Sequence, residues 1–224
     1  LRPGDPSSGP LPFIDTEDRT LQQGQGDRRV QAYNFRVCMT DDPVLRIPWA
    51  QPADYAPAQY ELARRWFCSE KDAYNEQLRT PGEPPAKFDI LPRRTAGGFH
   101  KTDTNNHGPV SSDFIGANHA WPEADYATRE RLFQAHVSYQ QGLYWCLAND
   151  PAIPARYREA YSRWGLPRDE FVDTGHWPHQ LYVREARRLI SDYVITERDC
   201  MGTARPDDPV GMGSYTLDSH NCSR

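Results

Sequence analysis

The sequence predicts an α+β fold, in which a small antiparallel or mixed sheet of distant strands is covered by two or three helices and bordered by long ordered loops. Residues 30–40 and 181–195 supply the strand-like runs. Between them, residues 123–149 and 154–164 have hydrophobic positions at helical spacing. Because the strand-like runs lie far apart in the chain, the sheet must be built from long-range pairs.

The N-terminal part divides into an arm and a strand. Residues 1–29 are dense in Pro, Gly, Ser and Asp, so they are predicted to be an extended arm or loop, and residues 30–224 the folded domain. Aromatic and β-branched residues in 30–40 favour a strand. On that strand Asn34 and Arg36 share one face. The face either lines a substrate cavity or is the solvent side of a half-buried strand.

Three segments are predicted to be helical. Residues 55–78 start near Pro57, which suits a first helical turn, and carry apolar residues at helical spacing. Residues 123–149 have the strongest apolar stripe. Residues 154–164 form a shorter helix, with Gly165 as a natural residue just beyond its C-terminus.

A polar loop spans residues 95–120 and contains three His, three Asn and two Asp. Long loops inside compact domains are usually functional or disordered, and apolar anchors in this one favour order. Amide, imidazole and ammonium groups suit hydrogen bonding to a sugar or a carboxylate, so we expect substrate contacts from Lys101, Asn105, Asn106 and His107. The alternative is a loop that satisfies its own backbone through Asx-turns.

A charged stretch between two apolar runs is the most distinctive feature of the C-terminal third. Arg184, Glu185, Arg187 and Arg188 lie between 181–183 and 189–195. Such charges are costly to bury unless they pair with each other or with a ligand. They form either a structural ion-pair cluster or a site for anionic or planar polar groups.

Two further features flank this stretch. His176 and His179 lie three residues apart, but a metal site needs a third ligand at known spacing, so we assign no metal. We expect them either to hydrogen-bond the backbone or to line a cavity. Thr196 and Asp199 have the spacing of a capping box and predict a helix start. Asp218, Ser219 and His220 do not predict a catalytic triad, because triad members converge from separate elements.

Size and composition exclude several classes of protein. The 224 residues allow one large domain or two small ones. The formal net charge of −5 gives no reason to expect nucleic acid or an anionic membrane as partner. No run approaches the roughly 18 to 20 apolar residues of a membrane helix. The five cysteines form no CxxC pair, and one or two disulfides are possible.

Five segments of this sequence resemble a family of FAD-dependent oxidoreductases, in the order in which that family has them. They are QAYNFRVCMTDDP at 31–43, KTDTNNHG at 101–108, RWGLPRDEF at 163–171, VREARRLISDYVITERD at 183–199, and DPVGMGSYTLDSHN at 208–221. Some secreted bacterial members of the family resemble proteins that carry the label xanthan lyase. The resemblance makes a secreted parent protein plausible.

The resemblance implies a role for each candidate residue. Arg184, Glu185, Arg187 and Arg188 would contact FAD, and His220 would be an acid or base near the flavin. Asn34, Arg36, the loop residues and the two histidines would contact a small-molecule or carbohydrate substrate. The sequence has no G-x-G-x-x-G after a strand, which is the turn that binds a dinucleotide. We therefore expect the chain to be the substrate-side portion of a larger parent protein. FAD would then be held mainly by a segment outside this chain, and the isolated chain would be redox-inactive.

A second hypothesis comes from a different class of protein. Abundant Trp and Tyr together with amide-rich loops would also suit a stand-alone carbohydrate-binding or polysaccharide-lyase-like module. A lyase would need a positioned base and an Arg or Asn to neutralise a uronate. Tyr, His and Arg are available, but no spacing singles them out.

Overall fold

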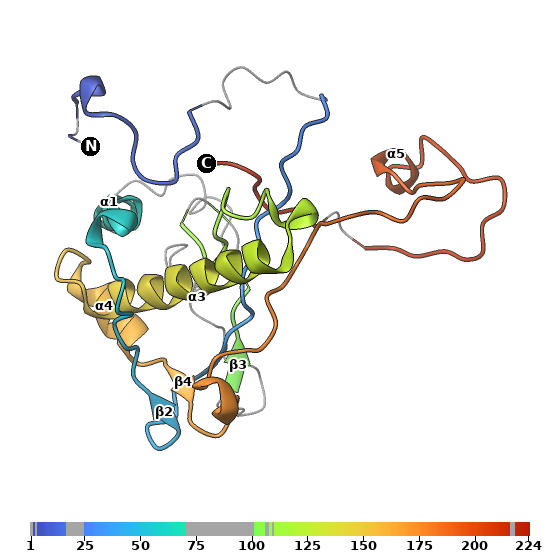
Figure 1. Ribbon diagram of the computed structural model, residues 1–224. Helices are drawn as coiled ribbons and strands as arrows, with labels where there is room; N and C mark the ends of the chain where they lie inside the picture. Colours follow the sequence, from blue (N-terminus) through green and yellow to red (C-terminus); the bar gives the residue numbers. More distant parts are fainter. Residues whose placement is uncertain are drawn as a thin grey trace, which may run out of the picture.

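The longest helix, α3 (Tyr126–Asn149), runs through the middle of the molecule. The computed structural model describes residues 2, 4–16, 25–69, 101–105, 108, 110–215 and 218–224. The extended segment 30–37 crosses α3, and the short strands gather at one end (Figure 1). The fold is α+β, as the sequence predicts.

Helix α3 begins at a side-chain cap and buries one face. The Asp125 carboxylate accepts a hydrogen bond from the Thr128 N–H, which satisfies one of the free donors of the first turn. A short 3-10 turn, η5 (Trp121–Glu123), precedes it. The predicted helix over 123–149 is therefore confirmed except for its first turn. The buried face consists of His136, Tyr139, Gln140, Gly142, Leu143, Tyr144, Cys146, Leu147 and Ala148.

Two shorter helices pack near the C-terminal half of α3. Helix α1 (Glu61–Cys68) follows the 3-10 turn η3 (Pro57–Tyr60), with Pro57 in the first turn as predicted. Residues 70–78 of the predicted helix lie outside the described residues. Helix α4 (Ala155–Ser162) packs against α3. The Phe67 ring of α1 meets the Tyr157 ring of α4 edge-on at 5.0 Å.

The strands form two antiparallel ladders. Strand β1 (Cys38–Thr40) pairs with β3 (Lys101–Asp103), and β2 (Arg46–Ile47) pairs with β4 (Leu166–Pro167). A bridge between Thr40 and Gly165 connects the ladders, and a second bridge joins Asn34 to Tyr182. The strand predicted over 30–40 is confirmed only at 38–40, since residues 30–37 are extended but belong to no strand. In this segment the Gln140 side chain of α3 binds both the N–H and the C=O of Phe35.

Side chains alternate along the extended segment as the sequence predicts. Tyr33, Phe35 and Val37 are fully buried on the side of α3. Asn34 and Arg36 point the other way, where Asn34 contacts Ser112 and Arg36 contacts Asp103. Asn34 is nevertheless fully buried, whereas Arg36 is exposed.

Gly165 has a different role from the predicted one. It does not end α4 in a left-handed conformation but lies in the bridge to Thr40. A Cβ on Gly165 would collide with the backbone carbonyl oxygen of Ile47. Glycine is therefore required there because two backbone segments approach closely, which a periodicity argument cannot detect.

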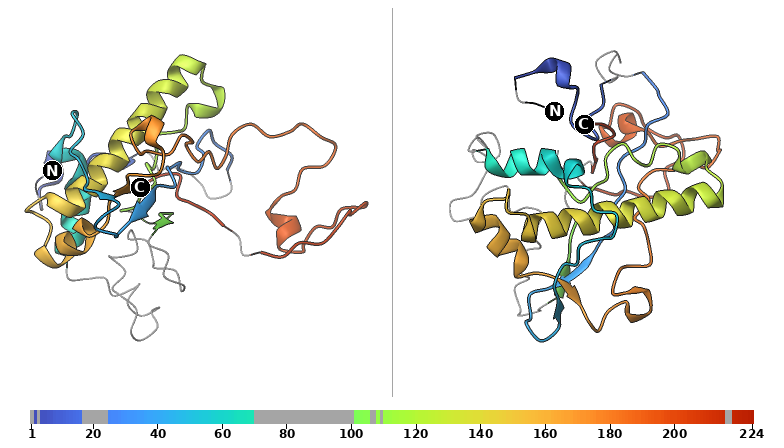
Figure 2. Two further views of the ribbon diagram at one scale, coloured as in Figure 1. Left: turned by 90° about the horizontal axis from the view of Figure 1, so that it is seen from below. Right: turned by 60° about the vertical axis from the view of Figure 1, so that its left-hand side comes forward.

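The predicted strand over 189–195 is wrong. Residues 186–215 form an arm that leaves the body of the molecule, clearest in the left view of Figure 2. Within it no strand forms over residues 189–195, because no other described segment pairs with them. Leu189 is 84% exposed and Ile190 97% exposed. The predicted capping box is confirmed, since Thr196 and Asp199 cap the short helix α5 (Glu197–Cys200).

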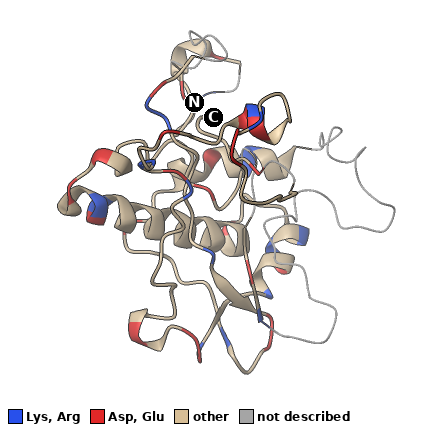
Figure 3. Cartoon of the chain, turned by 90° about the vertical axis from the view of Figure 1, so that its right-hand side faces the viewer, with Lys and Arg blue, Asp and Glu red and all other residues tan. Residues whose placement is uncertain are grey.

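The described residues also contain two 3-10 turns, η1 (Pro6–Ser8) and η6 (Val172–Thr174). All five cysteines lie in the described part of the chain, and no disulfide joins any two of them. Basic and acidic positions are interspersed over the cartoon in Figure 3. None of the helices in the described ranges has the length and apolar character that crossing a membrane requires.

Candidate functional site

Asp113 is the centre of a buried polar cluster. Its Oδ2 lies 2.6 Å from His220 Nδ1, and its Oδ1 lies 3.5 Å from Arg184 Nη2. The three side chains are 1%, 6% and 7% exposed, respectively. They come from the segment after β3, from the C-terminal segment and from the residues after the Tyr182 bridge. The fold therefore brings together a carboxylate, an imidazole and a guanidinium that are far apart in sequence.

Arg184 is held by several partners. Its Nε donates to the Ala32 carbonyl at 2.9 Å. Its Nη2 donates to Asn105 Oδ1 at 2.8 Å and to Asn34 Oδ1 at 3.3 Å. The guanidinium also lies over the Tyr182 ring, 4.9 Å from its centroid, which is a favourable cation–π distance. The guanidinium thus has one orientation, facing the amides of Asn34 and Asn105.

Asn34 and Asn105 extend the cluster toward the surface. The Asn34 Nδ2 donates to Ser112 Oγ at 3.1 Å and lies 3.4 Å from Asn105 Oδ1. Asn34 is fully buried, whereas Asn105 is exposed. The amide of Asn105 is therefore the point at which the cluster meets solvent, and a polar ligand can approach it there.

Gln31 connects His220 to Glu185. The His220 backbone N–H donates to Gln31 Oε1 at 2.6 Å. The Glu185 carboxylate accepts from the Gln31 backbone N–H at 2.8 Å and from its side-chain Nε2 at 3.1 Å. Within the described residues, no salt bridge joins Glu185 to an arginine. Arg184 pairs instead with Asp113, and Arg187 with Glu123.

The contact with Asp113 orients the His220 ring. Burial raises the pKa of Asp113, while the hydrogen bond from His220 and the charge of Arg184 oppose that rise. A carboxylate at Nδ1 holds the Nδ1–H tautomer, which leaves the lone pair of the neutral ring on Nε2. Nε2 lies 3.7 Å from the exposed Asp218 carboxylate. This arrangement can accept or deliver a proton at Nε2.

The other predicted residues lie elsewhere. Lys101 Nζ pairs with Asp169 and Glu170, each at 2.7 Å, and these hydrogen bonds raise its pKa. His176 Nδ1 lies 3.0 Å from the Glu170 carbonyl. His179 Nε2 is 3.7 Å from Asp173. These side chains surround η6, and no hydrogen bond or ion pair described for this part of the chain joins them to the Asp113 cluster.

The remaining predicted residues are at the edge of the cluster or beyond it. Arg36 pairs with Asp103 at 2.6 Å. Arg187 pairs with Glu123 at 3.2 Å, and both side chains are well exposed. Arg188 is exposed at the start of the arm. Asn106 and His107 lie outside the described residues.

Sequence reasoning missed Asp113, Gln31 and Ser112. Asp113 is one of two aspartates in a polar loop, and no local pattern distinguishes it from a loop residue that binds its own backbone. Gln31 lies in a segment that the family resemblance includes, so it could have been considered there. Among the described residues, no group of three or more His, Cys, Asp or Glu side chains could hold a metal ion.

Tryptophan burial bears on the carbohydrate-binding alternative. All six tryptophans fall within the described part, and each is buried or half-buried. Trp49, for example, stacks on Tyr144 with ring centroids 4.7 Å apart. The tryptophans therefore form core contacts and no open stacking platform for sugars.

His136 is a second buried histidine, and it is expected to make the chain acid-sensitive. Burial lowers its pKa to about 4. Since an unfolded histidine titrates near 6.5, the unfolded state binds more protons between pH 4 and 6.5. Stability should be complete above pH 6.5 and fall by about 3 kcal/mol as the pH drops to 4. Urea unfolding at a series of pH values measures this loss.

The control variants are His136→Phe and His179→Gln. The Phe variant should lose most of the acid-dependent change, because it has no group to protonate beside Tyr33 and Phe114. Replacing the exposed His179 should leave the pH dependence of the free energy of unfolding nearly unchanged. An equally steep loss in His136→Phe would show that another group is responsible.

Comparison with known proteins identifies the family. The model of a family described as FAD dependent oxidoreductase matches residues 6–224. The chain belongs to this family of FAD-dependent oxidoreductases. No curated protein and no solved structure matches the chain. Membership of the oxidoreductase family agrees with the five sequence segments that resemble it.

The helix starts of this oxidoreductase family member differ from those that hold FAD. A dinucleotide places its pyrophosphate at a helix N-terminus that follows a strand and a glycine-rich turn. Here the N-terminus of α3 carries Asp125, whose pKa is lowered by its hydrogen bonds to Thr128. Helix α1 begins with Glu61, and α4 follows Pro154. In the described ranges, none of these three helix starts follows a strand and a glycine-rich turn, so they do not fit a dinucleotide pyrophosphate.

Proposed function

We propose that this chain forms the substrate-side wall of a flavin-dependent oxidoreductase and binds a polar substrate at the Asp113 cluster. The observation that carries the proposal is the buried contact of Asp113 with both His220 and Arg184, next to the exposed amide of Asn105. A buried carboxylate with a shifted pKa that meets other titratable groups from distant segments is typical of functional sites. FAD would be held mainly by polypeptide outside these 224 residues.

Each residue of the cluster would have a separate task. Asn105 and the guanidinium of Arg184 would hydrogen-bond the carboxylate, carbonyl or hydroxyl oxygens of the substrate. His220 would exchange a proton at Nε2, and Asp113 would fix the ring and stabilise its protonated form. Asn34 would hold the Asn105 amide in place. Lys101, Arg36, His176, His179, Asn106 and His107 would contact more distant parts of a larger substrate.

The arm at 186–215 would bind the flavin-holding polypeptide. Large exposed apolar patches usually mark interaction surfaces. The arm exposes Leu189, Ile190, Ile195, Met201, Val210, Met212 and Tyr215. Arg187 and Arg188 lie at its start and would contact the negatively charged phosphates of FAD, with Glu185 nearby. These contacts would complete the site that the chain forms only in part.

Two measurements on the full-length gene product that contains this chain test the proposal. Its absorption spectrum should contain flavin bands that lose intensity on reduction. Under anaerobic conditions, a panel of sugars, uronic acids and hydroxy acids should then identify a compound that bleaches the flavin. His220→Asn should slow that bleaching about 10²- to 10⁴-fold, the usual contribution of a general acid or base.

The matched control is Arg131→Met, an exposed position on α3 outside the cluster. It should bleach at the same rate as the unchanged protein. A colourless protein that takes up no FAD would remove the flavin assignment. A coloured protein in which His220→Asn bleaches at the normal rate would remove only the role of His220.

A further inference from the structure

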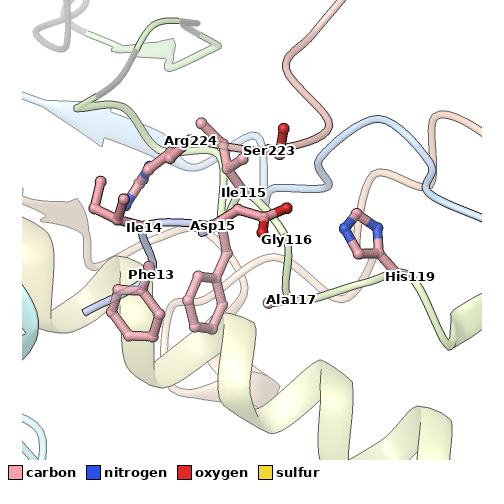
Figure 4. A pocket seen from close by; sticks show the side chains of 10 residues that line it. Phe13, Ile14, Asp15, Ile115, Gly116, Ala117, His119, Ser223 and Arg224 are labelled. Atoms are coloured by element: carbon pink, nitrogen blue, oxygen red, sulfur yellow. The ribbon is translucent and has the colours of Figure 1, made fainter. Parts of the chain in front are cut away.

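We propose that a cavity bordered by Phe13, Phe114, His119 and Arg224 binds a small aromatic carboxylate. The cavity adjoins the Asp113 cluster but is separate from it, and the inference does not depend on the proposed oxidoreductase activity. Figure 4 shows the lining side chains, which come from the N-terminal segment, the turn after Asp113 and the C-terminal segment.

The cavity has the size and the walls of a ligand site. Its volume is about 340 Å³, at the small end of the range of about 300 to 1,000 Å³ typical of ligand pockets. The Phe13 ring meets the Phe114 ring edge-on at 5.0 Å. Phe114 in turn stacks on Tyr139 of α3 at 4.2 Å. The aromatic wall is therefore fixed against the core, and a further ring can pack on it.

Arg224 brings a positive charge to this apolar cavity. One of its Nη atoms donates to the Tyr139 hydroxyl at 2.9 Å and to the Asp113 carbonyl at 3.4 Å. Its Nε is buried and has no hydrogen-bond partner among the described residues. A guanidinium has five N–H donors in a planar fork, which matches a carboxylate. Both contacts use Nη2, so the N–H donors of Nη1 are left for a ligand, with no hydrogen bond to them among the described residues.

The other polar side chains around the cavity add no net negative charge. The Asp15 carboxylate lies 3.6 Å from the guanidinium of Arg29, which balances it. His119 accepts a hydrogen bond from the Val30 N–H at Nδ1, so its proton is on Nε2. Burial lowers the pKa of His119, which keeps the ring neutral. The guanidinium of Arg224 therefore makes the net side-chain charge of the cavity positive. The Nε2–H of His119 is a second hydrogen-bond donor.

Titration of the 224-residue chain with 3-phenylpropionate and with the neutral 3-phenylpropan-1-ol tests the proposal, using saturation-transfer NMR and calorimetry. We expect one bound carboxylate per chain, with an affinity at least tenfold higher than that of the alcohol. Arg224→Met should weaken carboxylate binding about tenfold or more and leave alcohol binding unchanged. Ala117→Trp, from another wall, should abolish binding of both by filling the cavity.

Arg131→Met is the matched control and should bind both compounds normally, since Arg131 lies on the exposed side of α3. Circular dichroism establishes that each variant is folded. Equal affinity for acid and alcohol, no binding at millimolar concentration, or full carboxylate binding by a folded Arg224→Met would each overturn the proposal. If Arg224→Met does not fold, unchanged carboxylate binding by Ala117→Trp would overturn it instead.

Discussion

Replacing Arg184 by methionine is expected to destabilise the chain by about 3–5 kcal/mol, the usual cost of removing one member of a buried charged pair. The substitution leaves the buried Asp113 carboxylate without its positive neighbour. It also removes the hydrogen bond to the Ala32 carbonyl. The remaining hydrogen bond from His220 compensates in part, so the lower end of that range is expected. Urea unfolding measures the loss.

Two further variants separate this cause from a general loss of packing. The double variant Arg184→Met, Asp113→Asn should recover part of the stability, because no uncompensated carboxylate remains. Arg187→Met removes an exposed pair with Glu123 and should cost less than about 1 kcal/mol. Strictly additive effects in the double variant would contradict the proposed coupling between Arg184 and Asp113.

Replacing Gln140 by leucine is expected to cost about 2–6 kcal/mol. The fully buried Gln140 side chain accepts from the Phe35 N–H at 2.5 Å and donates to its C=O at 3.0 Å. Leucine has similar volume but leaves both backbone groups unpaired, and each unpaired buried group costs about 1–3 kcal/mol. Chemical denaturation followed by tryptophan fluorescence measures the change.

The matched control lies on the same helix. Gln134→Leu makes the same substitution at an exposed position, where the side chain only pairs with Glu130 one turn earlier. Its effect should be within about 0.5 kcal/mol. If the two leucine variants were equally stable, the Gln140 side chain would not be what holds the extended segment.

Local patterns predicted the parts of the fold that local physics decides. The apolar stripe predicted α3, and Pro57 predicted the start of the turn before α1. The Thr196–Asp199 spacing predicted the cap of α5. The alternation of Asn34 and Arg36 with Tyr33 and Phe35 follows from the pleat alone. These features depend on residues within a few positions of one another.

Long-range partners explain what the sequence could not predict. Residues 189–195 have the composition of a strand, but a strand needs a neighbour, and composition does not say whether one is present. Asp113 contacts His220 across 107 positions, so the sequence around either residue does not predict the contact. The residues around Arg184 left a structural ion pair and a ligand contact open, and the family resemblance implied the contact. Its partners Asn34, Asn105 and Asp113 come from segments that only the fold brings near.

The support of residues 32–35 by side chains has a consequence for the order of folding. Gln140 binds Phe35 across 105 positions, and Arg184 binds the Ala32 carbonyl across 152. A slip of one residue would turn Asn34 into the core and Phe35 toward the polar loop, so this register cannot be reached gradually. Closing two such long loops is entropically slow. The polar cluster is therefore expected to assemble last, after the helices are already in place.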